Sequence, residues 1–191
     1  MRTAYLFLGL LFLLLFVGAA VLFDKSNKPQ QAMTTFSLTS AAFENNGLIP
    51  SKFTCDGDNM NPELSISGVP ADAKSLALIM DDPDIPEEIT RSMGIKVFDH
   101  WVLYNISPET SVIGEGSAAG AQGLNTRGKA SYTGPCPPTQ YEPKEHRYIF
   151  KLYALSNTLN FIKAPTKKEL EQAMEGSIIG TAELVGRYRR L

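Results

Sequence analysis

Residues 75–86 have the sequence SLALIMDDPDIP, in which an apolar run leads into three carboxylates and two prolines. The apolar half predicts a strand in the middle of a sheet, because a strand covered on both faces carries few polar side chains. The carboxylates of Asp81, Asp82 and Asp84 repel one another unless a cation or a hydrogen-bond donor faces them. The prolines stiffen the backbone. We therefore expect either one wall of a ligand site or an ordinary Asp/Pro turn.

More strands are predicted on both sides of this run. They are alternating or mostly apolar segments bounded by Gly, Pro, Asn and Asp. These segments are residues 36–40, 64–67, 96–105 and 147–155. Residues 148–153 are mostly apolar, which favours a second central strand. Residues 113–138 differ, because they are rich in Gly, Ala and Ser, and so long an irregular stretch is usually functional or mobile.

The C-terminal part is expected to be partly helical. Thr166 and Glu169 form the pattern of a capping box, which predicts the start of a helix. One face of that helix carries Leu170, Ala173 and Met174. We expect a second helical segment at residues 177–184 and a last strand at residues 185–190. The predicted fold is mainly β, with two packed antiparallel sheets and one or two C-terminal helices.

Bulk composition favours one globular domain, which we place at residues 35–191. The chain has 191 residues, of which 43% are hydrophobic and 20% are charged. Its net charge of -2 argues against a nucleic-acid partner, because binding phosphates requires a basic face. Neither histidine flanks a cysteine, so no zinc-type cluster is predicted. No metal and no cofactor are expected.

The N-terminal residues predict export. Residues 4–23 form an uncharged run rich in Leu and Phe, preceded by Arg2, and this run is long enough to span a bilayer. Residues 1–23 therefore form either a signal anchor in the membrane or a cleaved signal peptide. Residues 24–34 are polar and are expected to form a tether. Either alternative places the domain in the periplasm or outside the cell, and the anchor holds it at the membrane.

The predicted export bears on the redox state of the two cysteines, Cys55 and Cys136. Cysteines in an oxidising compartment can pair, whereas those in the cytosol usually remain thiols. The sequence supplies no distance between them. A disulfide and two buried thiols therefore remain alternatives.

The chain has two histidines, and each lies in a predicted strand. Strand alternation places His100 on one face and Trp101 on the other. His146 and Tyr148 share a face, while Arg147 points the opposite way and is free to pair with Asp84 or Asp99. This spacing allows an imidazole and a phenol to act on one ligand.

The order of the motifs resembles the phosphatidylethanolamine-binding protein family, and in particular its bacterial and archaeal branch, often called Raf-kinase-inhibitor-like proteins. The resemblance covers residue 36 to the C-terminus. Its main motifs are Asp82–Pro86, Asp99–Trp101, Gly134–Pro138 and His146–Tyr148, and its supporting segments include residues 53–57, 67–70, 123–128 and 182–186. The combination is specific, although each motif alone is weak.

This resemblance implies a β-sandwich with a small anion pocket for a phosphate-like group such as a phospholipid headgroup. Its ligand-binding residues here are Asp82, His100, Gly134, Pro138, His146 and Tyr148. Asp82 is expected to hold one imidazole in the right tautomer rather than to touch the anion. The charged linker at residues 139–145 departs from the family pattern. Glu142 and Glu145 disfavour anions if they face inward.

Three functions follow, in order of support. The first is a non-enzymatic binding module that regulates a partner protein. The second is an inhibitor of a protease or kinase that acts through surface loops, which the resemblance also allows. The third is a hydrolase that uses Asp82, His100, His146 and Tyr148 as acid and base groups. It ranks last, because no nucleophile stands beside the histidines and no Gly-x-Ser-x-Gly motif is present.

Overall fold

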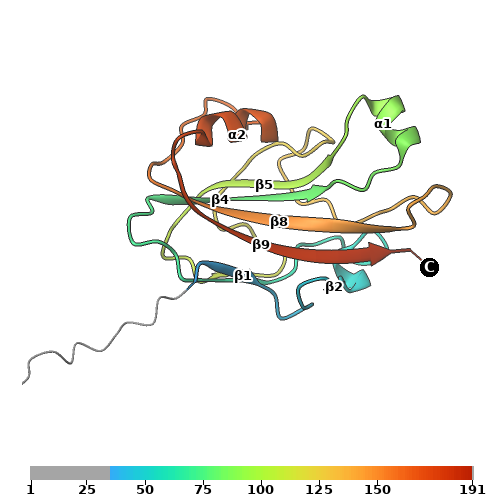
Figure 1. The fold of residues 1–191 in the computed structure, drawn as a ribbon, viewed down its shortest axis with the longest axis horizontal. Coiled ribbons are helices and arrows are strands. Elements are labelled where there is room, and N and C mark those ends of the chain that lie inside the picture. The colour runs from blue at the N-terminus through green and yellow to red at the C-terminus, as the bar shows by residue number, and fades with distance from the viewer. Residues whose placement is uncertain (1–34, 191) are drawn as a thin grey trace, which may run out of the picture. The chain divides into compact units, whose positions relative to one another are not determined.

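The structure is a computed structural model that describes residues 35–190 (Figure 1). Ser75–Asp82 forms strand β4, in which every residue is buried. It lies between β5 (Phe98–Ile106) and β8 (Glu145–Leu155), so the predicted central strand is confirmed. The strand is longer than predicted. Asp81 and Asp82 belong to it and not to the loop that follows.

The larger of the two sheets contains both central strands. Its strand order is β2-β9-β8-β4-β5-β7. The strands not yet defined are β2 (Gly47–Leu48), β7 (Ala121–Gln122) and β9 (Ile178–Arg189). Every pairing is antiparallel except that of β2 with β9, which is parallel. The prediction of purely antiparallel sheets is therefore wrong at this one edge.

A second, smaller sheet covers one face of the first. It has the order β1-β3-β6 and is antiparallel. Its strands are β1 (Ser37–Thr39), β3 (Leu64–Ser67) and β6 (Val112–Ile113). Leu38, Leu64 and Ile66 from this sheet share one buried cluster with Leu78 and Phe150 of the large sheet. The main core thus lies between two sheets, as predicted.

Two α-helices and one short 3-10 helix complete the described part. These are α1 (Glu87–Met93), α2 (Lys167–Met174) and the 3-10 turn Ser51–Phe53. Figure 1 shows α2 on one side of the large sheet and β1 on the other. The capping box of Thr166 and Glu169 is present as predicted. Leu170 and Met174 are buried against the sheet, whereas Ala173 is exposed.

The predicted helical segment at residues 177–184 is wrong. Strand β9 begins at Ile178 and pairs with β8 along almost its whole length. Ile178, Ile179 and Thr181 are β-branched, which favours the extended backbone. The ladder to β8 supplies backbone hydrogen bonds along the strand, and Gly180 would destabilise the middle of a helix.

The predicted signal or anchor at residues 1–23 and the tether at residues 24–34 lie outside the described residues. Within residues 35–190, no helix has the length and apolar character needed to cross a membrane.

Candidate functional site

The end of β4 places Asp82 beside both histidines. Oδ2 of Asp82 lies 2.7 Å from Nδ1 of His146 and 4.0 Å from Nε2 of His100. All three side chains are buried. Strands β4, β5 and β8 each contribute one of them, so three separate segments of sequence meet here.

A β-bulge directs His100 toward this point. Met80 of β4 pairs with Trp101, but the next residue, Asp81, pairs with Asp99. His100 is therefore the extra residue on β5. Its ring packs edge-on against Tyr148 at 5.2 Å, while Trp101 lies in the same inter-sheet core as Tyr148. The prediction that His100 and Trp101 face opposite ways is wrong, because the bulge interrupts the alternation.

Hydrogen bonds fix both imidazoles. Nδ1 of His100 lies 2.6 Å from the Thr133 carbonyl oxygen. A carbonyl only accepts, so this nitrogen carries a proton and Nε2 is directed toward Asp82. Nδ1 of His146 donates to Asp82, and its Nε2 lies 3.1 Å from the carbonyl oxygen of Pro143.

Asp82 remains ionised in this setting. Burial raises the pKa of its carboxyl, but the interactions with His100 and His146 outweigh that effect and hold the pKa below its ordinary value. The backbone N–H of Asp84 also donates to Asp82 at 2.9 Å. The carboxylate thus contacts the ring of one histidine, His146, at hydrogen-bonding distance.

Tyr148 lies on the same face of β8 as His146, as predicted, and is fully buried. Burial, and next the charge of Asp82, raise the pKa of its hydroxyl, which stays protonated. Within residues 35–190, no group meets its oxygen at hydrogen-bonding distance and angle, although the Cys136 backbone opposes the rise in pKa. A buried hydroxyl without a partner is uncommon.

A cavity of about 210 Å³ opens beside these groups. Its polar side comprises Asp82, His100, Arg127, Thr133 and His146. Its apolar side comprises Ile85, Pro86, Ile89, Met93, Phe98, Pro137 and Pro138, and the wall is completed by Gly134 and Cys136. The residues predicted for the pocket therefore line it, except Tyr148, which packs against His100 behind the wall.

Sequence reasoning did not assign several lining residues to the site. Helix α1, which contributes Ile89 and Met93, was not predicted. Arg127 and Thr133 fall within the irregular stretch at residues 113–138. The only signal for Arg127 was its place inside the supporting motif at residues 123–128.

The loop after β4 is held from behind the site. Arg147 makes three hydrogen bonds to the Asp84 carboxylate, one from its backbone and two from its guanidinium, at 2.7–2.9 Å. Those bonds lower the pKa of Asp84. Of the two partners predicted for Arg147, Asp84 is therefore the one that it contacts. Asp99 instead lies 3.2 Å from Nζ of Lys167.

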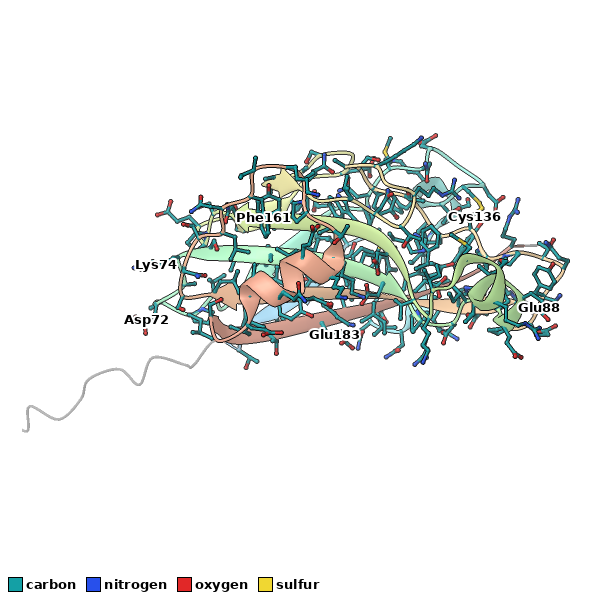
Figure 2. All side chains as sticks on the ribbon, turned by 90° about the horizontal axis from the view of Figure 1, so that it is seen from above. Asp72, Lys74, Glu88, Cys136, Phe161 and Glu183 are labelled. Atoms are coloured by element: carbon teal, nitrogen blue, oxygen red, sulfur yellow. A yellow bond between two sulfur atoms is a disulfide. The ribbon has the colours of Figure 1, made fainter. Side chains whose placement is uncertain are left out.

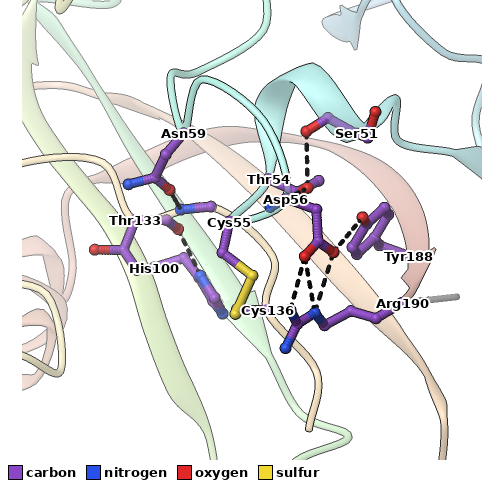
Figure 3. The surroundings of a disulfide bond; sticks show 11 residues. Ser51, Thr54, Cys55, Asp56, Asn59, His100, Thr133, Cys136, Tyr188 and Arg190 are labelled. Carbon is purple, nitrogen blue, oxygen red and sulfur yellow. Dashed lines mark hydrogen bonds and ion pairs between the residues drawn. A yellow bond between two sulfur atoms is a disulfide. The ribbon is translucent and has the colours of Figure 1, made fainter. Parts of the chain in front are cut away.

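The opposite wall is held by a disulfide between Cys55 and Cys136 (Figure 3). The structure thus pairs the two cysteines, whose Cα atoms are 5.4 Å apart. Oδ1 of Asn59 accepts from the backbone N–H of Gly134 in the same wall. A Cβ on Gly134 would lie 2.6 Å from the Phe53 carbonyl oxygen, so a larger residue does not fit. Figure 2 shows Cys136 at the same end of the molecule as Glu88 of α1.

The two glutamates of the linker before His146 face partners other than the cavity. Glu145 pairs with Arg187 at 2.8 Å, and Glu142 lies 3.6 Å from Lys144 at the surface. Neither glutamate lines the cavity.

Comparison with known proteins identifies the family of this chain. The family profile described as "Phosphatidylethanolamine-binding protein" matches residues 39–189. The chain belongs to this family. A UPF0098 protein from Methanothermobacter thermautotrophicus is 44% identical over 161 residues, which cover 81% of this chain and 99% of that protein. A UPF0098 protein from Chlamydia trachomatis is 46% identical over 154 residues, covering 80% and 98%.

Solved structures of phosphatidylethanolamine-binding protein homologues have the same fold. That of CT736 from Chlamydia trachomatis matches with a TM-score of 0.76 at 43% identity, covering 82% of this chain and 99% of the other. YbcL from E. coli, described as a member of the mammalian family, matches with a TM-score of 0.70 at 26% identity, covering 82% and 99%. The resemblance drawn from the motifs is confirmed.

Proposed function

We propose that the protein is a non-enzymatic binding protein whose cavity holds a small phosphate-like anion, such as a phospholipid headgroup. The observation that carries the proposal is the pair of buried imidazoles on one ionised carboxylate, beside a cavity of about 210 Å³. A protein buries such groups at a cost, and perturbed groups in a cleft are typical of functional sites.

The imidazoles supply the charge for an anion. His100 lines the cavity, with its Nε2 4.0 Å from Asp82, and an imidazole is a side chain that can carry positive charge toward a bound anion. Tyr148 does not line the cavity but packs against His100, and its protonated hydroxyl is a further donor if a bound anion reaches it. Asp82 holds His146 in place and does not need to contact the anion.

The apolar side of the cavity supports a ligand that is not purely ionic. Ile85, Ile89, Met93 and Phe98 are among the apolar residues that line the cavity, and the Phe98 ring lies 4.7 Å from the His100 ring. Such a lining suits the carbon portion beside a phosphate group, because apolar contact adds affinity while a few polar groups fix the orientation.

The hydrolase alternative has less support. Within the described residues, the candidate nucleophiles in the cavity wall are Thr133 and Cys136. Cys136 is in the disulfide, and the Thr133 hydroxyl accepts a hydrogen bond from Asn125. Neither is paired with an imidazole as a nucleophile and its base would be. Regulation of a partner protein and inhibition of a protease or kinase through surface loops stay predictions.

We further propose that the domain works outside the cytosol. The Cys55–Cys136 disulfide supports an oxidising compartment. The apolar run at residues 4–23 supports a membrane anchor or a signal peptide.

The test is an NMR titration with phosphate and with phosphoethanolamine, observing the ring signals of His100 and His146. We expect both rings to shift, and His100→Gln to weaken binding at least about tenfold. Lys74→Gln, at an exposed position outside the cavity lining, is the matched control and leaves affinity unchanged. Rings that stay unperturbed at millimolar ligand refute the proposal. Turnover of a phosphoester panel that is lost in His100→Gln would favour the hydrolase.

A further inference from the structure

A second hollow adjoins the histidine cavity. It has a volume of about 170 Å³ and shares Arg127, Thr133, Gly134 and Cys136 with the first cavity. Its other lining residues are Cys55, Asn59, Lys129, Ser131 and Tyr132. The two hollows therefore lie on either side of one wall, and the Arg127 side chain lines both.

The charged side chains that line this hollow are all positive. Arg127 and Lys129 line it, no carboxylate is among its described lining residues, and neither cation forms an ion pair within residues 35–190. Ser131 adds a hydroxyl. Asn59 accepts from Gly134 through its oxygen, which leaves its amide N–H groups as further donors. The side chains thus offer cations and donors without a competing anion.

The nearest acidic residues do not cancel this charge. Asp56 is held by Arg190 at 2.8 Å and by the Tyr188 hydroxyl at 2.7 Å (Figure 3). Asp58 precedes Asn59 but does not line the hollow. The Tyr132 hydroxyl donates to the Phe53 carbonyl oxygen at 2.8 Å, so this phenol is already satisfied.

One buried side chain sets the shape of the cationic loop. Asn125 is 4% exposed, and its Oδ1 accepts from the backbone N–H of Arg127 at 2.9 Å and of Lys129 at 3.1 Å. Its Nδ2 donates to the Ser131 carbonyl oxygen at 2.9 Å and to the Thr133 hydroxyl at 3.0 Å. The backbone that presents both cations is therefore fixed before any ligand arrives, which lowers the entropy cost of binding.

We propose that this second hollow is an anion site, and that the protein prefers ligands with two phosphate-like groups. One group occupies the histidine cavity, the other lies between Lys129 and Ser131, and Arg127 contacts both. The second half of this statement rests on the proposed function of the histidine cavity. The first half stands on the hollow alone.

The experiment compares methylphosphonate with alkane bisphosphonates from methylene to hexamethylene, using the full domain. NMR records the ring signals of His100 and His146 and the backbone amides of residues 125–133. We expect one spacer length to bind at least about tenfold more tightly than methylphosphonate, because the second group adds charge-assisted hydrogen bonds. Lys129→Gln should remove most of that gain and leave methylphosphonate affinity within about twofold.

Controls make the result specific. Arg127→Gln should weaken both ligands, because this side chain lines both hollows. The double variant Lys74→Gln, Lys168→Gln removes two positive charges at exposed positions, whereas Lys129→Gln and Arg127→Gln each remove one. It should leave the affinities for both ligands unchanged. Lys74 lies at the end of the molecule away from Cys136 (Figure 2).

Each outcome decides a separate point. If the histidine signals shift but no spacer length gains affinity, or the gain persists in Lys129→Gln, the second site is refuted and the proposed function stands. If the amides of residues 125–133 shift while the histidine signals do not, the second site stands and the histidine cavity is refuted. If neither set shifts, both are refuted.

Discussion

Asp81 and Asp82 are neighbours on β4, both are buried, and each faces two basic side chains. Asp81 points to the outer face of the sheet, where Nζ of Lys151 and of Lys167 both lie 2.8 Å from it. Asp82 points to the inner face, toward His100 and His146. One step along a strand thus separates a carboxylate that faces two lysines from a carboxylate that faces two histidines.

This difference separates structure from function. The lysines keep Asp81 compensated at any physiological pH, and Lys167 carries the link from α2 to the sheet. The two histidines and Asp82 line the cavity of about 210 Å³, whereas Asp81 does not. We therefore expect substitutions at Asp81 to change stability alone, and substitutions at Asp82 to change binding as well.

Asp81→Asn is expected to have the largest effect on stability. It leaves Lys151 and Lys167 beside a neutral group in a partly buried position, which costs about 4 kcal/mol. Asp99, at 3.2 Å from Lys167, retains part of the pairing. Urea unfolding measures the loss. Phosphate affinity should stay within about twofold of wild type, and a tenfold loss in a folded variant would contradict the division between the two faces.

Asp82→Asn should lower the free energy of unfolding less than Asp81→Asn does, but it should weaken phosphate binding more. His146 loses its carboxylate partner, and a charged hydrogen bond replaced by a neutral one costs about 2–3 kcal/mol. Phosphate affinity should fall about tenfold or more, because the imidazole is no longer held in one orientation. Calorimetric titration measures it against Asp81→Asn as the matched control. Equal affinities in the two variants would show that Asp82 is only structural.

The sequence predicted this site better than its surroundings. The motifs around Asp82, His100 and His146 are local, and the spacing of His146 and Tyr148 needs only the alternation of a strand. The orientation of His100 was missed, because a bulge depends on the pairing between β4 and β5 and not on either strand alone. The lysine partners of Asp81 were missed for the same reason, since Lys167 comes from a helix far along the chain.

The fold was predicted where local patterns were unambiguous. The buried strand at residues 75–80 and the capping box at Thr166 were both found. Residues 177–184 were not, because a short segment that mixes β-branched residues with Ala, Glu and Leu suits both helix and strand. Pairing with β8 decides between them, and that partner lies outside the segment.

Tyr148→Phe tests the role of the buried Tyr148 hydroxyl on the inner face of the large sheet. It removes a buried hydroxyl that has no partner in the described residues, so the unliganded protein should become more stable by about 1–2 kcal/mol. If the hydroxyl donates to the bound anion, the same variant loses affinity. Thermal unfolding with and without phosphate measures both effects. Tyr153→Phe, on the opposite face of β8, is the control. Lower stability in Tyr148→Phe would mean that the hydroxyl is already satisfied.

The smallest expected difference is in how stability depends on pH, at most about 1.4 kcal/mol per pH unit for each titrating proton. Burial raises the pKa of Asp82, but the histidines lower it further, so the net pKa is depressed. The stability that Asp82 contributes is present above its unfolded-state pKa near 3.9. It is lost as pH falls through its pKa in the folded protein.

Lys151 and Lys167 have the opposite behaviour at the other end of the pH scale. Burial lowers their pKa, but the bonds to Asp81 outweigh it, so both values are raised. The stability that these two lysines contribute is present below their unfolded-state pKa near 10.4. It is lost as pH rises through their pKa in the folded protein. Asp81→Asn should therefore flatten the alkaline limb of a stability–pH curve, and Asp82→Asn should flatten part of the acid limb, where Asp84 and Asp56 also contribute. Urea midpoints from pH 2 to 11 measure both limbs. If each variant flattened the other limb, the assignment of the alkaline limb to Asp81 and its lysines and of part of the acid limb to Asp82 would be wrong.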